Sequence, residues 1–232
     1  MKTVTELLQL VSLPLLLTLG AFQLGLLLQR KLKSPLCNPI LISVLLILGF
    51  LSLTGMTVAD YQAGIGSISW LLTPATICLA IPMYEHAQVL RRNLSAIAVG
   101  VCAGAVSCLA MVGVFSVLCG FDPELTVSLL PKSVTTAIGV PLSTLSGGVD
   151  AITTVAIMCT GIFASILGPT LCKLFRLTHP VAQGAAFGTA GHVIGTSKAT
   201  ELSPLAGAVS SLSLVVAGLL TAVLFPLAVS LL

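Results

Sequence analysis

The chain alternates long apolar runs with a few short polar stretches. Six runs approach or exceed the length that crosses a bilayer: Leu7–Leu28, Pro39–Gly55, Trp70–His86, Leu94–Leu118, Val149–Phe175 and Leu205–Leu232. A hydrocarbon core about 30 Å thick needs about 20 apolar residues in a helix, and in lipid only helices or closed barrels satisfy their backbone polar groups. The runs lack the alternation of barrel strands. The pattern therefore predicts an all-α polytopic membrane protein with about six spanning helices.

Composition agrees with this pattern. Of the 232 residues, 56% are hydrophobic and 7% are charged, whereas soluble domains carry about 25% charged residues. The net charge of +3 comes from short clusters of cations, so it indicates no nucleic-acid-binding face. The seven cysteines stand singly without CxxC spacing, which is typical of small buried apolar residues and not of metal ligands. We expect a lipid bilayer around the chain and neither a metal nor an organic cofactor.

Basic clusters orient the helices, because Lys and Arg are retained on the cytoplasmic side of a membrane. The clusters are Arg30-Lys31-Lys33, Arg91-Arg92 and Lys173 with Arg176. If all three lie inside, the amino terminus lies outside. Two semi-polar stretches, Leu125–Leu145 and Pro180–Pro204, then enter and leave by one face each, as re-entrant hairpins from opposite sides. The alternative is a pair of broken helices that cross fully, which would put Lys173 and Arg176 outside.

Residues 94–148 and 149–204 resemble each other. Each segment has a long helix, a polar loop that ends in Asp122-Pro123 or His179-Pro180, and then a turn rich in hydroxyls and small residues. Insertion from opposite faces makes them an inverted repeat, the organisation of many secondary transporters, which bind substrate near the midplane on discontinuous helices. We expect one membrane domain over residues 1–232, with scaffold helices in 1–93 and a terminal helix in 205–232.

Lys132 is the clearest candidate for chemistry. This cation lies inside a semi-apolar stretch, where charges are costly and usually face a cavity or a partner. Ser133, Thr135 and Thr136 follow it, and a half-helix that starts near Thr135 offers unpaired N–H groups. The set predicts a site for a carboxylate. The alternatives are that Lys132 extends to the surface, or that it pairs structurally with Asp150.

The second polar stretch holds another cluster: Thr189, His192, Thr196, Ser197, Lys198 and Glu201. His192 is a candidate to carry a proton or to bind substrate, and the alternative is a hydrogen-bonded packing residue between helices. Lys198 and Glu201 lie three apart, so they would share a helix face as an ion pair. For coupling to a proton or a sodium ion, or for ion pairs, the candidates are His192, Asp150, Lys198 and Glu201.

Signatures of enzymes are missing from the sequence. It contains no GxSxG, no HExxH and no phosphate-binding P-loop, which are the arrangements that would supply a nucleophile, a catalytic metal or a nucleotide site. We therefore expect a protein that is not an enzyme.

Several stretches resemble the LrgB/CidB family: Leu130–Thr136, Gly188–Thr196 with Glu201, Asn38-Pro39 and Pro82–Glu85. The resemblance covers nearly the whole chain and implies a bacterial cytoplasmic (inner) membrane. Members are commonly described as antiholin-like regulators of murein hydrolase export that act beside a small LrgA/CidA-type partner. A plastid relative is a glycolate and glycerate translocator, and some bacterial members are associated with pyruvate uptake. The family motifs match at Lys132, Ser133, Thr135, Thr136, His192 and Glu201.

These observations favour a secondary transporter of small monocarboxylates of the glycolate, glycerate, pyruvate or lactate type. It would work by elevator-like alternating access, with the hairpins moving against the scaffold helices, and a homodimer is one assembly that would suit it. The alternative is an LrgB-type regulator of murein hydrolase activity and autolysis that acts with an LrgA/CidA-type membrane partner.

Overall fold

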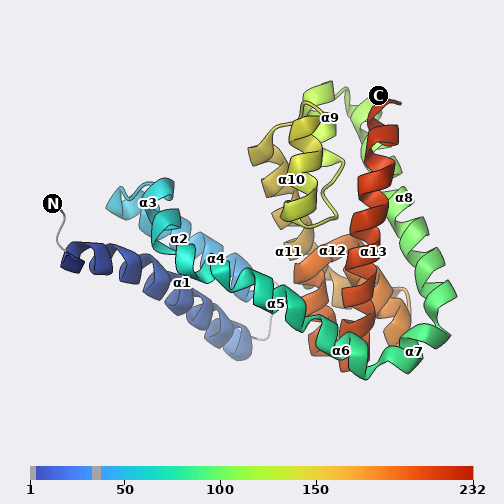
Figure 1. The fold of residues 1–232 in the computed structure, drawn as a ribbon, viewed down its shortest axis with the longest axis horizontal. Coiled ribbons are helices and arrows are strands. Elements are labelled where there is room, and N and C mark those ends of the chain that lie inside the picture. The colour runs from blue at the N-terminus through green and yellow to red at the C-terminus, as the bar shows by residue number, and fades with distance from the viewer. Residues whose placement is uncertain (1–3, 33–37, 232) are drawn as a thin grey trace. The chain divides into compact units, whose positions relative to one another are not determined.

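The computed structural model describes residues 4–32 and 38–231, and within these ranges all side chains except those of residues 4–12, 67, 69 and 72. Every regular element in the described ranges is a helix (Figure 1). The chain divides into two compact units, Met1–Cys78 and Leu79–Leu232. The prediction of an all-helical protein is confirmed.

The first unit contains α1 (Val4–Leu32), α2 (Pro39–Thr54), α3 (Val58–Gly64), α4 (Gly66–Trp70) and α5 (Leu72–Cys78). Asn38 starts α2, because its Oδ1 accepts the Ile40 N–H at 2.9 Å and caps the helix. α1 packs closely on this start, since a Cβ built on Gly25 would lie 2.8 Å from the Pro39 carbonyl oxygen.

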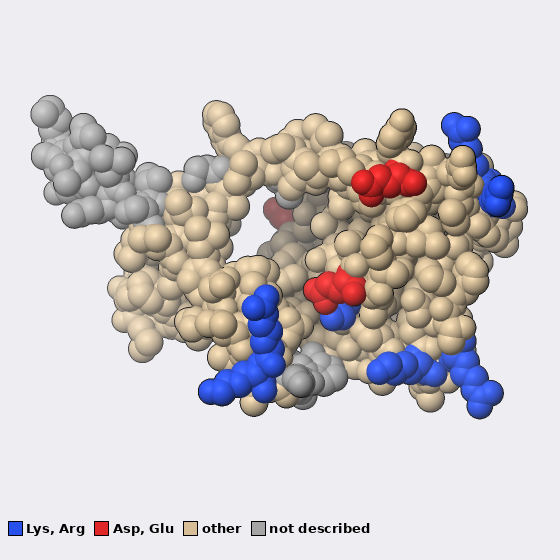
Figure 2. Space-filling model, turned by 90° about the horizontal axis from the view of Figure 1, so that it is seen from below, with Lys and Arg blue, Asp and Glu red and all other residues tan. Residues whose placement is uncertain are grey.

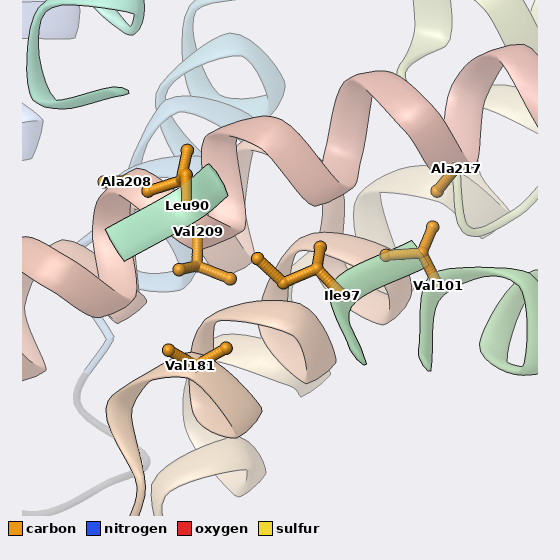
Figure 3. Close-up of a cluster of buried hydrophobic side chains, with 7 residues drawn as sticks. All are labelled: Leu90, Ile97, Val101, Val181, Ala208, Val209 and Ala217. Atoms are coloured by element: carbon orange, nitrogen blue, oxygen red, sulfur yellow. The ribbon is translucent and has the colours of Figure 1, made fainter. Parts of the chain in front are cut away.

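The second unit contains α6 (Ala80–Glu85), α7 (Ala87–Arg92), α8 (Leu94–Cys119), α9 (Pro123–Leu129), α10 (Thr136–Leu145), α11 (Asp150–Leu174), α12 (Pro180–Leu202) and α13 (Pro204–Val229). Side chains from four of these helices form its main apolar core: Leu90, Ile97, Val101, Val181, Ala208, Val209 and Ala217 (Figure 3). This core ties α8, α12 and α13 together.

Four helices of the described chain are long and apolar enough to cross a membrane: Leu13–Leu32, Leu94–Cys119, Asp150–Leu174 and Pro204–Val229. The expected run Pro39–Gly55 is the apolar helix α2, which has 16 residues. The expectation of one helix over Trp70–His86 is wrong, because short helices replace it there. Pro74 and Pro82 explain the breaks, since each proline lacks an N–H and clashes with the carbonyl four residues earlier.

Six of the cysteines lie in the described ranges, and their burial differs from the expected pattern. Only Cys172 among these six is buried, whereas Cys78, Cys102, Cys119 and Cys159 are exposed on the protein surface. The reason is that apolar helices of a membrane protein turn much of their apolar surface outward.

The first polar stretch folds into a helical hairpin of α9 and α10. Asp122 caps α9 through its side chain, which accepts the Leu125 N–H at 2.7 Å. The chain then turns at residues 130–135 and returns, because the Val149 N–H donates to Ser128 Oγ at 2.7 Å. The start of α11 thus lies beside the last turn of α9, and the turn between α9 and α10 forms the tip of hairpin 1.

The second polar stretch folds back as well. His192 has a non-helical φ of 43° and ψ of −137°, which divides α12 into residues 180–191 and 193–202. A Cβ built on Gly195 would lie 2.5 Å from the Phe187 carbonyl oxygen, whereas eight residues of straight helix span about 12 Å. The two halves of α12 therefore form hairpin 2, with His192 at its tip.

The two hairpins lie along α13 from opposite ends. Val127 and Leu130 of hairpin 1 pack with Phe225 near the C-terminal end of α13. In hairpin 2, Thr200 lies against Gly207 near the other end of α13. Figure 1 shows α9 and α10 near the C-terminal end of α13, with α12 toward its start.

Candidate functional site

Hairpin 1, through α10, and the tip of hairpin 2 both meet the same residue of α11. A Cβ built on Gly139, in α10, would lie 2.7 Å from Ile157 Cδ1. From hairpin 2, His192 Nε2 lies 2.9 Å from the Ile157 carbonyl oxygen. Ile157 is 1% exposed. The structure therefore brings together the two polar stretches, which are far apart in the sequence.

The tip of hairpin 1 carries Lys132, Ser133, Thr135 and Thr136. The nearest polar contact of the Lys132 ammonium is Ser133 Oγ at 3.5 Å, a long distance for a hydrogen bond. Lys132 is half-buried and Ser133 is buried. The alternative pairing of Lys132 with Asp150 is wrong, because the one ion pair within the described residues joins Lys198 to Glu201.

The start of α10 adds donors to this tip. Thr135 occupies the N-cap position, yet its side chain makes no capping hydrogen bond. The first N–H groups of a helix have no partner inside it, and the helix dipole places partial positive charge there. A cation, hydroxyls and helix N–H groups together suit a carboxylate, which forms its strongest hydrogen bonds with charged donors.

The tip of hairpin 2 is bonded into the protein. A carbonyl oxygen only accepts, so Nε2 of the His192 ring donates to the Ile157 carbonyl. Gly161 makes room for this contact, since a Cβ built there would lie 2.6 Å from His192 Cε1. His192 is 4% exposed. In this conformation it matches the alternative role, a hydrogen-bonded packing residue between helices.

The hydroxyls of Thr189 and Thr196, like the His192 ring, form hydrogen bonds within the protein. Thr189 Oγ1 donates to the Ala185 carbonyl at 2.7 Å. Thr196 Oγ1 lies 2.9 Å from the His192 carbonyl and 2.8 Å from Ser210 Oγ on α13. Both threonines are buried. Each hydroxyl bonds to the carbonyl four residues earlier, and that of Thr196 also fixes hairpin 2 to α13.

The remaining candidates lie away from the tips. Ser197 is exposed on the second half of α12, and Lys198 and Glu201 continue toward the end of that half-helix. Lys198 Nζ and Glu201 Oε2 lie 2.6 Å apart, so the predicted ion pair is confirmed. Asp150 is the first residue of α11 and accepts a hydrogen bond from Thr154 Oγ1 at 3.0 Å.

Sequence reasoning missed the residues that receive the hairpins. Ile157 and Gly161 lie on α11, and Ser210 lies on α13. A backbone carbonyl carries no sequence signal, so the contact of Ile157 with His192 was hidden. The sequence Ser210-Ser211-Leu212-Ser213 inside an apolar helix was the available signal for Ser210, because buried hydroxyls in spanning helices usually bond to a neighbouring helix.

Apolar helices of spanning length and two polar helical hairpins define an α-helical membrane protein. The LrgB-like family model matches residues 18–231, nearly the whole chain. The protein belongs to the LrgB-like family. No solved structure matches the chain.

Proposed function

We propose that the protein is a secondary transporter of small monocarboxylates of the glycolate, glycerate, pyruvate or lactate type. The observation that carries this proposal is the approach of both polar hairpins to Ile157, from opposite ends of α13. Transporters of several folds bind substrate between discontinuous helices near the middle of the membrane. A protein that only held a partner would not need two polar hairpins against one buried residue.

The carboxylate binds at the tip of hairpin 1 in this proposal. Lys132 supplies the opposite charge, and Ser133, Thr135 and Thr136 supply hydroxyl donors. The substrate's hydroxyl or oxo group lies toward the tip of hairpin 2, where His192 is the candidate contact. Thr189 and Thr196 are bonded within the protein, and Ser197 lies away from the tip. A 2-hydroxy or 2-oxo acid carries both kinds of group on neighbouring carbons, so two adjacent tips would recognise it.

Alternating access follows in this proposal from an inverted repeat that relates the two hairpins. Residues 94–148 and 149–204 form an inverted repeat in this proposal, and the two hairpins move together against scaffold helices in 1–93 by an elevator-like motion. The protein lies in the bacterial cytoplasmic membrane with its amino terminus outside. A proton or a sodium ion is the coupling ion, and a homodimer provides a fixed frame for the motion.

The proposal is tested with purified protein in proteoliposomes. We expect uptake of radiolabelled glycolate or pyruvate by the chain without any partner, and thermal stabilisation by the same acids, because a ligand that binds the folded state raises its apparent stability. Acetamide, which has no charge, serves as the control for the carboxylate. The absence of both uptake and stabilisation over a panel of small carboxylates would refute the proposal.

A second candidate function is favoured by the family match, which supports it more directly than it supports transport. In this reading the protein is an LrgB-type regulator of murein hydrolase activity and autolysis that acts with an LrgA/CidA-type membrane partner. It predicts no flux from the purified chain and an autolysis phenotype that depends on the partner. Flux from this chain alone would count against it.

A further inference from the structure

A groove of about 460 Å³ runs between α8 and the first half of α12. Its floor includes Ile97 and Val181, two side chains of the main apolar core (Figure 3). Small residues form its walls: Ala96 and Gly100 on α8, and Ala182 and Ala186 on α12. Small walls leave the groove wide enough for a short organic acid.

One end of the groove is polar and lies next to basic residues. Asn93 and His179 line it there, and the exposed Arg91, Arg92 and Arg176 are within three residues of them in the sequence. These three arginines form the basic rim of the groove. Figure 2 shows Lys and Arg side chains projecting from separate places on the face that it draws. Positive charge at the mouth of a narrow passage raises the local concentration of anions.

The two polar side chains at this end keep free donors. The His179 Nδ1 accepts the Val181 N–H at 3.3 Å, so in the neutral ring the hydrogen is on Nε2. The Asn93 amide nitrogen uses one of its two hydrogens on the Val89 carbonyl at 2.9 Å. Both groups can therefore donate to a carboxylate.

The other end of the groove is Thr189, three residues before His192. A Cβ built on Gly104 would lie 2.8 Å from Thr189 Cγ2, so the threonine methyl group packs directly on α8. This contact closes the groove toward the tip of hairpin 2. The groove thus runs from the basic rim toward the tip of hairpin 2.

We propose that this groove is the path by which the carboxylate substrate passes between the basic rim and the hairpin tips, with the contact of Thr189 and Gly104 as its closed inner end. The inference rests on the proposed transport function and adds a route to it. The ligand class is a small organic anion, because the groove has donors and nearby cations at its mouth and small apolar walls beyond.

Two matched variants test the path by uptake. Gly100 and Gly113 both lie on α8, and a Cβ at either position meets no atom within 4 Å. Gly100 lines the groove, whereas Gly113 lines a separate apolar groove beside α13. We expect Gly100→Leu to lower the initial uptake rate about tenfold by narrowing the passage, and Gly113→Leu to stay within about twofold of wild type. Equal rates for the two variants would overturn the path.

A labelling experiment separates failure of the path from failure of the transport function. Ala186→Cys is made in a chain whose seven native cysteines are replaced by serine or alanine, and is treated with anionic sulfonatoethyl methanethiosulfonate. We expect modification that Gly100→Leu slows about tenfold and that added substrate also slows. Reaction only with an uncharged, membrane-permeant maleimide would show that the groove opens to lipid and would refute the path. Anionic labelling without wild-type uptake would refute the proposed function, and the path with it.

Discussion

The tip of hairpin 1 leaves its cation and hydroxyls with few hydrogen bonds, whereas the tip of hairpin 2 is hydrogen-bonded to neighbouring helices. Among the residues that the structure describes, the Lys132 ammonium contacts only Ser133 Oγ, at 3.5 Å, and the Thr135 side chain does not cap its own helix. In hairpin 2, His192 bonds to Ile157 and Thr196 bonds to Ser210, both at less than 3 Å. Both polar stretches fold as helical hairpins. The polar groups at the tip of hairpin 2 have hydrogen-bond partners in the protein, and those at the tip of hairpin 1 have few.

The difference separates two roles. Polar groups without partners in the protein are available to a ligand, so the tip of hairpin 1 is suited to bind the substrate carboxylate. Polar groups already bonded to neighbouring helices fix the position of the tip that carries them. Changes at the tip of hairpin 1 should therefore alter uptake more than stability, and changes around the tip of hairpin 2 should alter stability at least as strongly as uptake.

The largest effect is expected for Lys132→Met, which keeps most of the side-chain length but removes the charge. Hydrogen bonds to charged groups contribute about 1.5 to 3 kcal/mol, which corresponds to a loss of uptake of roughly 10- to 100-fold at low substrate concentration. The melting temperature without ligand should stay near that of wild type, while the stabilisation by glycolate or pyruvate disappears.

Lys173→Met is the matched control, because it removes one positive charge from an exposed position at the end of α11. It should leave uptake within about twofold of wild type, since exposed charges are screened by salt. Wild-type uptake by Lys132→Met would show that hairpin 1 is not the anion site. The proposed difference in role between the two tips would then be refuted as well.

The second largest effect is expected for Gly161→Ala, which places a methyl group against the buried His192 ring. The new methyl group would lie 2.6 Å from His192 Cε1 and 2.9 Å from Ile194 Cδ1. Overpacking together with loss of the bond to Ile157 should lower the unfolding free energy by about 2 to 4 kcal/mol, seen as a lower melting temperature in detergent. Gly113→Ala, in open space on α8, should be neutral or slightly stabilising. Equal melting of the two variants would show that His192 is not held there.

The third comparison uses two variants, Thr196→Val and Thr135→Val, which we expect to change different properties. Thr196→Val keeps the shape but leaves the buried Ser210 hydroxyl without this partner, which should cost about 1 to 2 kcal/mol of stability. Thr135→Val removes a hydroxyl that caps nothing, so stability should change little while the apparent affinity for substrate falls about threefold to tenfold. If stability and substrate affinity changed in the same way in both variants, the proposed difference between the two hairpins would be refuted.

The sequence predicted the hairpins because their ends have local signals. Asp122-Pro123 and His179-Pro180 begin helices in the structure as expected, since both side chains accept an N–H of the first turn. The basic clusters required each stretch to return to its starting face, and both stretches fold back. The polar residues at the tips were recognisable because charge and hydroxyls interrupt apolar runs.

What the sequence could not predict depends on contacts between distant residues or on strain. The positive φ of His192 has no sequence signal, because this backbone region favours glycine and is held here by the surrounding packing. The short helices in place of the expected run Trp70–His86 were not predicted, because the apolar composition of that run hides the breaks near Pro74 and Pro82. The state of hydrogen bonding at each tip, which distinguishes the hairpins, also depends on tertiary structure.

The smallest effect is expected for Glu201→Gln, although Glu201 matches the family motif. Its pair with Lys198 is 2.6 Å long, but the Glu201 side chain is 58% exposed, and exposed ion pairs contribute about 0 to 1 kcal/mol. Glu201 also lies nine residues after His192, about 14 Å along a helix. We expect uptake within about twofold of wild type and a small additional change in the double variant with Lys198→Met. A tenfold loss of uptake in Glu201→Gln, not reproduced by Lys198→Met, would instead make Glu201 a coupling residue and place part of the function at the base of hairpin 2.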